Sequence, residues 1–312
     1  MSFAFIFPGQ GSQSVGMLAD LAEGHPQVTE TFAEASEALG YDLWKLTQEG
    51  PAEELNQTHV TQPAMLAGGI AVYRAWQAQG GAQPLAMAGH SLGEYTALVA
   101  AGSLSLTDAV QLVADRGRFM QAAVPAGSGA MAAILGLDDA MVIEVCEIAE
   151  EGEVVSAVNF NSPGQVVVAG HRAAVERAVE RAKEAGAKRA VLLPVSVPSH
   201  CSLMLPAAEK LAERLAETDF KAPRVPVYNN VDVRAESDPD AIRAALKRQL
   251  FSPVRWVETI QALAEAGVDT VVECGPGKVL AGLNKRINKG MGTHVTQDSD
   301  SLAKALAATK GE

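Results

Sequence analysis

The chain of 312 residues is 48% hydrophobic and 20% charged, a globular composition with enough length to bury a large core. Its net charge of −12 disfavours nonspecific binding to nucleic acid or to an anionic membrane. The three cysteines, Cys146, Cys201 and Cys274, are widely spaced without a CxxC pair, which favours reduced thiols over disulfides. We expect a cytoplasmic protein without nucleic-acid or membrane partners, and one that acts as a monomer.

The N-terminal part of the chain predicts strands that alternate with helices. Phe3–Phe7 is an apolar strand that ends at Pro8 and opens into a glycine-rich loop, residues 9–13. Helical periodicity follows over Pro26–Leu39 and over Pro63–Gln79. Apolar runs that alternate with helices in this way predict an α/β fold with a mainly parallel sheet.

Gly89-His90-Ser91-Leu92-Gly93 has the pattern of a nucleophile elbow. An apolar stretch, residues 85–88, precedes it, and an apolar helical stretch, residues 95–101, follows it. Small residues on both sides permit a sharp strand-to-helix turn, which would expose the Ser91 hydroxyl at the end of a sheet. Backbone N–H groups at the start of the new helix would remain free to bind an anion. The pattern and its context favour a catalytic serine.

The next helix, Leu106–Met120, with Thr107 as a possible N-cap, contains a charged residue on its apolar stripe. Arg116 lies at helical spacing from the apolar positions, whereas Arg118 lies about 200° further around, on the other face. A buried guanidinium needs a carboxylate partner. That partner is either an internal acidic residue or a substrate carboxylate held bidentately by Arg116.

The middle third predicts the order β-α-β-β-α-β, which is the ferredoxin-like arrangement. A turn at Asn161-Ser162-Pro163-Gly164 separates its two central strands. The predicted elements are strand 130–135, helix 139–150, strand 154–158, strand 165–169, helix 172–185 and strand 189–193. We therefore predict a large α/β domain over 1–125 and 195–312, with a small α+β subdomain inserted over 126–194.

The last third returns to the α/β pattern, and its tail from Gly290 is polar and predicted to fray. The predicted elements are helix 206–217, strand 225–228, helices 240–250 and 254–266, strand 270–273 and helix 279–287.

A catalytic serine needs a base, and His200 is the strongest candidate because its loop is fixed by Pro198. The alternative is that His200 caps the following helix. His90 adjoins the serine, but neighbouring side chains in a tight elbow point in different directions. The other histidines, His25, His59, His171 and His294, lie in polar surroundings that favour a solvated role.

No acidic residue is an obvious third member of a triad, although Asp232 and Glu273 lie near predicted strand ends and remain candidates. A second solution uses the backbone. The helix that begins near Asp240 must end before Pro253, so the carbonyl of Gln249 lacks a partner within the helix. Such a carbonyl can accept the imidazole N–H and fix its tautomer.

Two further classes of site find little support in the sequence. A dinucleotide-binding GxGxxG pattern that starts at Gly9 would need glycine at position 14, where the chain has Ser14. No His or Cys cluster has metal-ligand spacing, so we expect no metal.

Taken in order, several motifs resemble those of the bacterial malonyl-CoA:acyl-carrier-protein transacylases, the loading enzymes of type II fatty-acid synthesis. The resemblance covers nearly the whole chain and includes Arg116 and Gln249. Its motifs are Pro8-Gly9-Gln10-Gly11-Ser12-Gln13, Gly89-His90-Ser91-Leu92-Gly93-Glu94, Val197-Pro198-Ser199-His200 and Glu273-Cys274-Gly275-Pro276-Gly277. The family fold has a hydrolase-like large domain with a ferredoxin-like insert, in agreement with the predicted element order.

The resemblance implies transfer of a malonyl group from malonyl-CoA to the thiol of acyl-carrier protein through a malonyl-serine intermediate, without a cofactor. It makes Ser91 the nucleophile, His200 the general base and acid, and Arg116 the ligand of the malonyl carboxylate. The Gln249 carbonyl would orient His200, and the backbone N–H groups of Gln10 and Leu92 would form the oxyanion hole. Ser199 stands where malonyl-selecting domains of multidomain synthases commonly have phenylalanine, so that position does not predict the acyl group here.

Two other functions remain possible from the sequence: a serine thioesterase or other hydrolase with the same elbow, and a non-catalytic module that binds carrier protein. The resemblance implies an acidic carrier protein, which would need a basic patch on this chain. Two clusters qualify, although each is equally consistent with a solvated charged surface. They are Lys278, Lys285, Arg286 and Lys289, and Lys183, Lys188 and Arg189.

Overall fold

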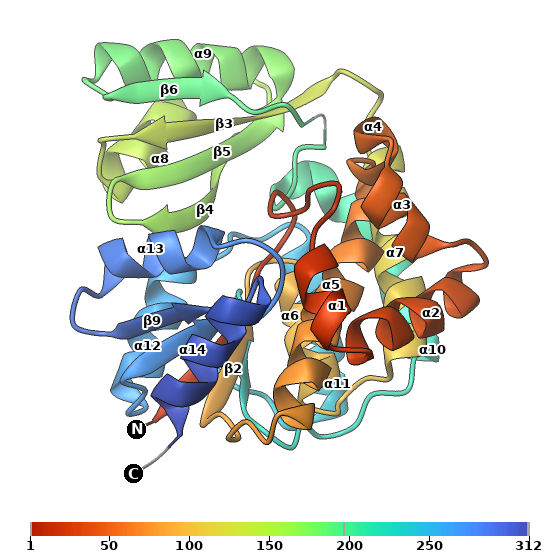
Figure 1. Cartoon of the computed structure of the whole chain (residues 1–312). Helices are drawn as coiled ribbons and strands as arrows, with labels where there is room; N and C mark the ends of the chain where they lie inside the picture. Colours follow the sequence, from red (N-terminus) through yellow and green to blue (C-terminus); the bar gives the residue numbers. More distant parts are fainter. Residues whose placement is uncertain (1, 196, 311–312) are drawn as a thin grey trace.

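The computed structural model describes residues 2–195 and 197–310, which form two β-sheets flanked by helices (Figure 1). The larger sheet has the strand order β7-β2-β1-β8-β9, and all neighbouring strands are parallel. Its strands are β1 (Phe3–Phe7), β2 (Ala86–Gly89), β7 (Val227–Tyr228), β8 (Thr270–Glu273) and β9 (Gly292–Val295). The predicted α/β class with a mainly parallel sheet is confirmed.

The two faces of the larger sheet are covered by different helices, and the alternation along β1 explains how both faces are apolar. Phe5 and Phe7 belong to one hydrophobic core, while Ala4 and Ile6 belong to another on the opposite face. The second core is closed by α12 (Trp256–Glu265) and α13 (Val279–Ile287).

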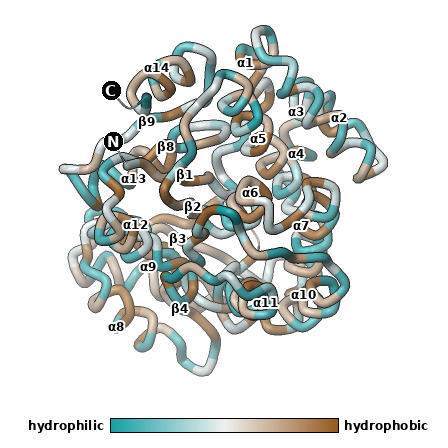
Figure 2. Tube along the Cα trace, turned by 90° about the horizontal axis from the view of Figure 1, so that it is seen from below, coloured by the Kyte–Doolittle hydropathy of each residue, from teal (hydrophilic) through white to brown (hydrophobic). Residues whose placement is uncertain are grey.

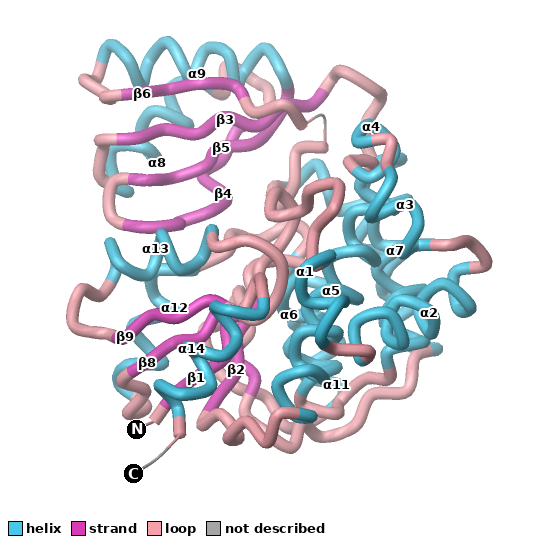
Figure 3. The backbone as a smooth tube through the Cα atoms, viewed as in Figure 1, coloured by secondary structure: helices cyan, strands magenta, loops and turns pink. Residues whose placement is uncertain are grey.

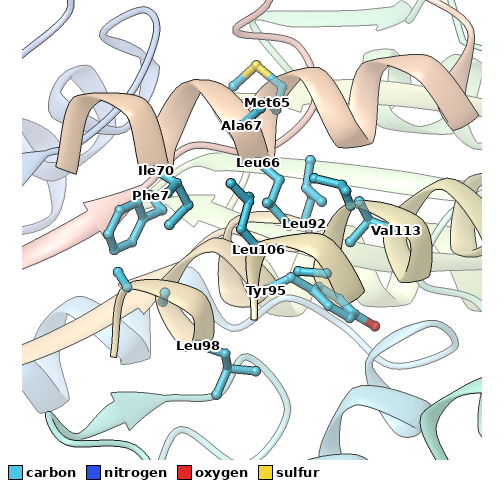
Figure 4. Close-up of a cluster of buried hydrophobic side chains, with 14 of the residues drawn as sticks. Phe7, Met65, Leu66, Ala67, Ile70, Leu92, Tyr95, Leu98, Leu106 and Val113 are labelled. Atoms are coloured by element: carbon cyan, nitrogen blue, oxygen red, sulfur yellow. The ribbon is translucent and has the colours of Figure 1, made fainter. Parts of the chain in front are cut away.

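The first core is the larger one, and it fixes the helix that follows the elbow. Leu92 and Tyr95 at the start of α6 pack with Leu66 and Ile70 of α5 in a single buried cluster (Figure 4). The helices that contribute to this core are α1 (Ala19–Gly24), α2 (Gln27–Leu39), α3 (Leu43–Glu49), α4 (Ala52–Leu55), α5 (Thr58–Ala78), α6 (Gly93–Ala100), α7 (Leu106–Ala122), α10 (Leu205–Glu217), α11 (Pro239–Gln249) and α14 (Ser299–Thr309). A short 3-10 helix, Ser202–Met204, precedes α10.

The smaller sheet is antiparallel and has the order β4-β5-β3-β6 (Figure 3). With its two helices it follows the predicted β-α-β-β-α-β order, and this strand order is that of the ferredoxin-like arrangement. Its elements are β3 (Gly129–Leu135), α8 (Asp139–Ala149), β4 (Val155–Ser162), β5 (Gln165–His171), α9 (Arg172–Glu184) and β6 (Arg189–Leu192). All of them lie within 126–194, and the division of the chain into domains at those bounds stays a prediction.

The smaller sheet is hydrogen-bonded to the segment that leads into α12. Phe160 N–H of β4 donates to the Val254 carbonyl at 3.1 Å, and Val254 N–H donates to the Val158 carbonyl at 2.8 Å. The prediction that a helix begins at Val254 was therefore wrong, because this residue pairs with β4 and the helix begins at Trp256. β4 extends to Ser162, and Asn161 near its end is hydrogen-bonded to His90 of the elbow.

One predicted helix start and one predicted N-cap were also wrong. The helix predicted from Pro63 begins at Thr58, and Pro63 lies inside it. Proline is enriched in the first turn of helices because it has no N–H to donate, but here an additional turn precedes it. The N-cap of α7 is Ser105 rather than Thr107, since the Ser105 hydroxyl accepts the N–H of Asp108 at 3.0 Å.

The predicted frayed tail was wrong as well. β9 pairs with β8 in parallel at the edge of the larger sheet, and α14 follows it. Asp298 caps α14 through the Ser301 N–H at 2.8 Å, and Leu302 and Ala305 are buried in the first core. The residues of the tail are polar on average, and this average hides the amphipathic pattern of the helix.

Hydrophobic residues follow the central strands β1 and β2, while hydrophilic residues gather on the outer helices and loops (Figure 2). Within residues 2–195 and 197–310, no helix has the length and apolar character needed to cross a membrane.

Candidate active site

Ser91 lies in a sharp turn between β2 and α6, and its own backbone is in the left-handed region with φ 51°. The flanking glycines allow close packing around this turn. A Cβ atom at Gly89 would lie 1.8 Å from the Gly93 carbonyl carbon, and one at Gly93 would lie 2.1 Å from the Phe7 carbonyl oxygen. The elbow therefore needs glycine at both positions for space, at the carboxyl ends of the two central strands.

His200 and Ser91 are hydrogen-bonded to each other. The Ser91 Oγ–His200 Nε2 distance is 2.8 Å, and His200 Nδ1 lies 2.7 Å from the Gln249 carbonyl oxygen. Because a carbonyl can only accept, Nδ1 carries the proton and Nε2 is free to accept the serine proton. The imidazole makes no capping bond to the helices that follow it, so the helix-capping alternative was wrong.

The His200 imidazole is held neutral by its surroundings. Its side chain is buried, and burial, with the nearby positive charge of Arg116, lowers the pKa of His200 to about 3. Its backbone is also in the left-handed region, with φ 66°, and its N–H donates to the Leu250 carbonyl at 3.0 Å. His200 is thus held through its side chain and its backbone by the C-terminal end of α11.

The other candidates for base and orienting group are engaged elsewhere. His90 Nε2 lies 2.8 Å from Asn161 Oδ1, on the smaller sheet. Asp232 accepts two hydrogen bonds from Arg248, at 2.8 and 2.6 Å. Glu273 accepts the backbone N–H groups at the start of α13, at 3.1 and 2.7 Å. In the described part of the chain, the only group hydrogen-bonded to His200 Nδ1 is the Gln249 carbonyl.

The loop after β1 packs directly against the elbow. A Cβ atom at Gly9 would lie 2.5 Å from the His90 carbonyl oxygen, so the loop approaches the turn at backbone distance. Among the described residues, the N–H groups of Gln10 and Leu92 donate to no other group. Both remain available to an oxyanion beside Ser91, as the resemblance implies.

Arg116 is 1% exposed and its guanidinium reaches the nucleophile. Nη2 lies 3.2 Å from Ser91 Oγ and 3.0 Å from Gln249 Oε1, and Nη1 lies 2.8 Å from Gln62 Oε1. Nε is buried without a hydrogen-bond partner. Arg118 is on the other face of α7, as predicted, and pairs with Asp115.

No carboxylate in the described residues forms an ion pair with Arg116, so the alternative of an internal salt bridge was wrong. In a guanidinium, Nε–H and one N–H of Nη2 point the same way and together bind a carboxylate side-on. Here Nε has no partner, whereas both N–H groups of Nη2 already donate, to Ser91 Oγ and to Gln249 Oε1, so a carboxylate bound at this edge would replace one of these two bonds. The geometry suits an anionic group carried by the acyl chain.

Two buried residues of the site were missed by the sequence analysis. Asn230 accepts the Ser91 N–H at 2.7 Å and donates to the Gly89 carbonyl at 2.7 Å, which supports the strained turn on both sides. Glu94, 2% exposed, accepts from Gln249 Nε2 at 2.8 Å. A signal for Asn230 was present: two asparagines directly follow an apolar strand, at the sheet edge where the elbow also lies.

Within the described residues, no group of three His, Cys, Asp or Glu side chains could hold a metal ion. The site instead combines a neutral base, a hydroxyl, two free amides and a buried guanidinium around one point. Those are the parts that acyl transfer through a serine ester requires.

Comparison with known proteins agrees with this chemistry. A model of the acyl transferase domain matches residues 4–307. The chain belongs to the acyltransferase family. The malonyl CoA-acyl carrier protein transacylase of Escherichia coli strain K12 is 63% identical over 304 residues, which cover 97% of this chain and 98% of that protein.

Solved structures show the same similarity for the whole acyltransferase fold. An acyl carrier protein S-malonyltransferase from Vibrio cholerae is 60% identical, with a TM-score of 0.96 over 98% of this chain and all of that one. A malonyl-transacylase solved in complex with a holo type II PKS acyl-carrier protein is 56% identical, with a TM-score of 0.98 over 99% of this chain and all of that one.

Proposed function

We propose that this acyltransferase moves a malonyl group from malonyl-CoA to the thiol of acyl-carrier protein through a malonyl ester of Ser91. The named relatives support the substrates, since they are malonyl transferases and one was solved with its acyl-carrier protein. The observation that carries the choice of acyl group is the buried Arg116 with its unpartnered Nε beside Ser91. We propose that the reaction needs no cofactor and proceeds in the monomer.

In the first half-reaction, Ser91 Oγ attacks the thioester carbonyl while His200 Nε2 takes the hydroxyl proton. The negative charge that develops on the carbonyl oxygen is stabilised by the N–H groups of Gln10 and Leu92. The carbon–sulfur bond then breaks, and His200 returns the proton to the departing CoA sulfur. The products are CoA thiol and the malonyl-serine ester.

The second half-reaction is the reverse, with a different thiol. The thiol of acyl-carrier protein gives its proton to His200, and its sulfur attacks the ester carbonyl. The bond to Ser91 Oγ breaks, and His200 returns the proton to the serine. The Gln249 carbonyl keeps the imidazole in one tautomer throughout, because it always accepts from Nδ1.

For docking of the carrier protein we favour the cluster Lys278, Lys285, Arg286 and Lys289, which is exposed on and around α13. The loop that leads into α13 lies against the loop that carries Gln10, since a Cβ atom at Gly277 would lie 3.3 Å from Ser12 Cβ. In the other cluster, Lys183 is already paired with Glu180 at 2.7 Å. Charge reversal at Lys278 and Lys285 should raise the KM for acyl-carrier protein but not for malonyl-CoA; an unchanged KM would exclude this surface.

The decisive experiment is a pulse of malonyl-CoA without acceptor, followed by mass spectrometry of the intact protein and of its peptides. We expect one malonyl group on the peptide that contains Ser91, and its removal when acyl-carrier protein is added. Ser91→Ala is the matched control and should stay unmodified. A malonyl group on another residue would refute the proposed nucleophile.

The same pulse separates the alternatives. A thioesterase would release CoA continuously without acyl-carrier protein, because water would accept the acyl group. A non-catalytic carrier-binding module would release no CoA and form no ester. We expect one equivalent of CoA per active site without acceptor, and continuous release only when acyl-carrier protein is present.

A further inference from the structure

The side chain of Gln249 links Arg116, the proposed ligand of the malonyl carboxylate, to α6, the helix that follows Ser91. Its Nε2 donates to Glu94 Oε2 at 2.8 Å and to the Ser91 carbonyl at 3.1 Å. Its Oε1 accepts from Arg116 Nη2 at 3.0 Å. Gln249 is fully buried, so water cannot replace these partners. Its side chain thus has a separate task from its carbonyl, which holds His200.

Only one orientation of this amide suits Arg116. Rotation of the amide by 180° would exchange its oxygen and nitrogen and would point an NH2 group at the guanidinium, donor against donor. Nε2 is held in place by two acceptors, the Ser91 carbonyl and the carboxylate of Glu94. Glu94 is the stronger acceptor of the two when its carboxyl is ionised, because a hydrogen bond to an ionised group is shorter and stronger than a neutral one.

Glu94 itself is well placed for this role. It lies in the first turn of α6, is 2% exposed, and its Oε2 also accepts the Asn230 backbone N–H at 2.9 Å. No cation in the described residues forms an ion pair with it. Burial raises the pKa of Glu94 to about 7, against the opposing effects of its hydrogen bonds and of Arg116, with Asp232 adding to the rise. A buried carboxyl that the two half-reactions never use therefore needs another explanation.

We propose that Glu94 is a positioning residue for acyl selection: it fixes the Gln249 amide, whose oxygen holds the Arg116 guanidinium in position for the malonyl carboxylate. Glu94 does not contact the acyl group, and it acts only through Gln249. The inference rests on the proposed function of Arg116. It assigns malonyl preference to a buried chain of three side chains from α6, α11 and α7.

The test compares malonyl-CoA with acetyl-CoA, which has no terminal carboxylate, as donors in single-turnover acylation of Ser91. Glu94→Ala should reduce the malonyl rate by about tenfold, the cost of leaving the buried Gln249 amide without its acceptor, and the acetyl rate by less than about threefold. Glu94→Gln keeps an oxygen that accepts from Gln249 and should recover most of the malonyl rate. Thr96→Ala is the matched control, because Thr96 is buried in the same helix and its hydroxyl has no hydrogen-bond partner in the described residues. It should leave the ratio of the two rates unchanged.

A double-mutant cycle tests the proposed route through Gln249. Gln249→Ala removes the side-chain amide but keeps the carbonyl that orients His200, so its malonyl loss should resemble that of Glu94→Ala. The double variant should lose no more than either single variant, because both interrupt one connection. Additive losses, or equal losses for malonyl and acetyl groups, would overturn the inference.

Folding is monitored by thermal unfolding. If Glu94→Ala does not fold, the decision falls to Gln249→Ala together with Glu94→Gln. A malonyl-specific loss in the former and recovery in the latter support the inference, and any other pair of results overturns it. Failure of the proposed role of Arg116 is recognised separately. Arg116→Ala would then cause no malonyl-specific loss of rate, whereas failure of this inference alone leaves that malonyl-specific loss in place.

Discussion

Replacement of Arg116 by alanine is the sharpest test of how this enzyme chooses its acyl group. The guanidinium is buried, its Nε has no partner, and its Nη2 lies 3.2 Å from the nucleophilic oxygen. A malonyl group on Ser91 would place its carboxylate against this edge. An acetyl group would place only a methyl group there.

The expected magnitude follows from the two hydrogen bonds that the side-on edge can donate. Hydrogen bonds to charged groups contribute about 1.5–3 kcal/mol each, so the loss of both should cost about 3–6 kcal/mol. At 1.36 kcal/mol per tenfold change in rate, malonyl acylation should slow by about 10²–10⁴-fold. Acetyl acylation should change by less than about tenfold, since only the contact of Nη2 with Ser91 Oγ is lost.

The assay is single-turnover acylation with each donor, read by mass spectrometry of the intact protein. Arg118→Ala is the matched control, because Arg118 lies on the same helix, is exposed and pairs with Asp115. Arg116→Lys keeps the positive charge but loses the planar guanidinium that binds a carboxylate through two N–H groups, and should restore only part of the malonyl rate. Equal losses with the two donors would refute the reasoning, since they would show that Arg116 supports the nucleophile and not the acyl group.

Three further results are expected. Asn230→Ala should slow malonyl and acetyl acylation equally, since its side chain supports the Ser91 turn and not the acyl pocket; a loss confined to malonyl would contradict this. With acetyl-CoA as the donor, on which Glu94 should have little effect, the pH profile of kcat/KM should show no loss between pH 7 and pH 5. The folded pKa of His200, about 3, keeps it in the base form as pH falls through that range; a fall centred near 6.5 would contradict the assignment. Asp298→Ala should lower the free energy of unfolding by about 1 kcal/mol, measured by urea denaturation, through loss of the α14 cap; an unchanged midpoint would contradict its contribution.

The sequence predicted the fold well wherever apolar periodicity was continuous. β1, β8 and α13 have the predicted bounds, because strongly alternating or amphipathic runs leave little freedom. The errors lie where a tertiary partner decides. Val254 would suit a helix, but β4 offers its backbone two hydrogen bonds, and β9 becomes a strand only because β8 lies beside it.

Within the site, predictability depended on how local the signal was. The glycines around Ser91 and the helix end near Gln249 are readable along the chain, and the structure brings both to His200. Glu94 and Asn230 are 136 positions apart and have meaning only when they meet. An acidic residue after a nucleophile is otherwise a plausible first-turn helix residue, because the helix dipole favours a negative charge there.

The two glycines of the elbow have a consequence for how an acyl donor and an acyl acceptor of such different size reach one serine. Neither has a left-handed backbone; they act as gaps that let a strand end and a helix start touch at backbone distance. A turn packed this closely cannot bend without steric clashes, so the position of Ser91 is fixed. The sulfur atoms of CoA and of the carrier protein must therefore reach the same point in space. Any conformational adjustment occurs in the surrounding loops or in the molecule that carries the thiol.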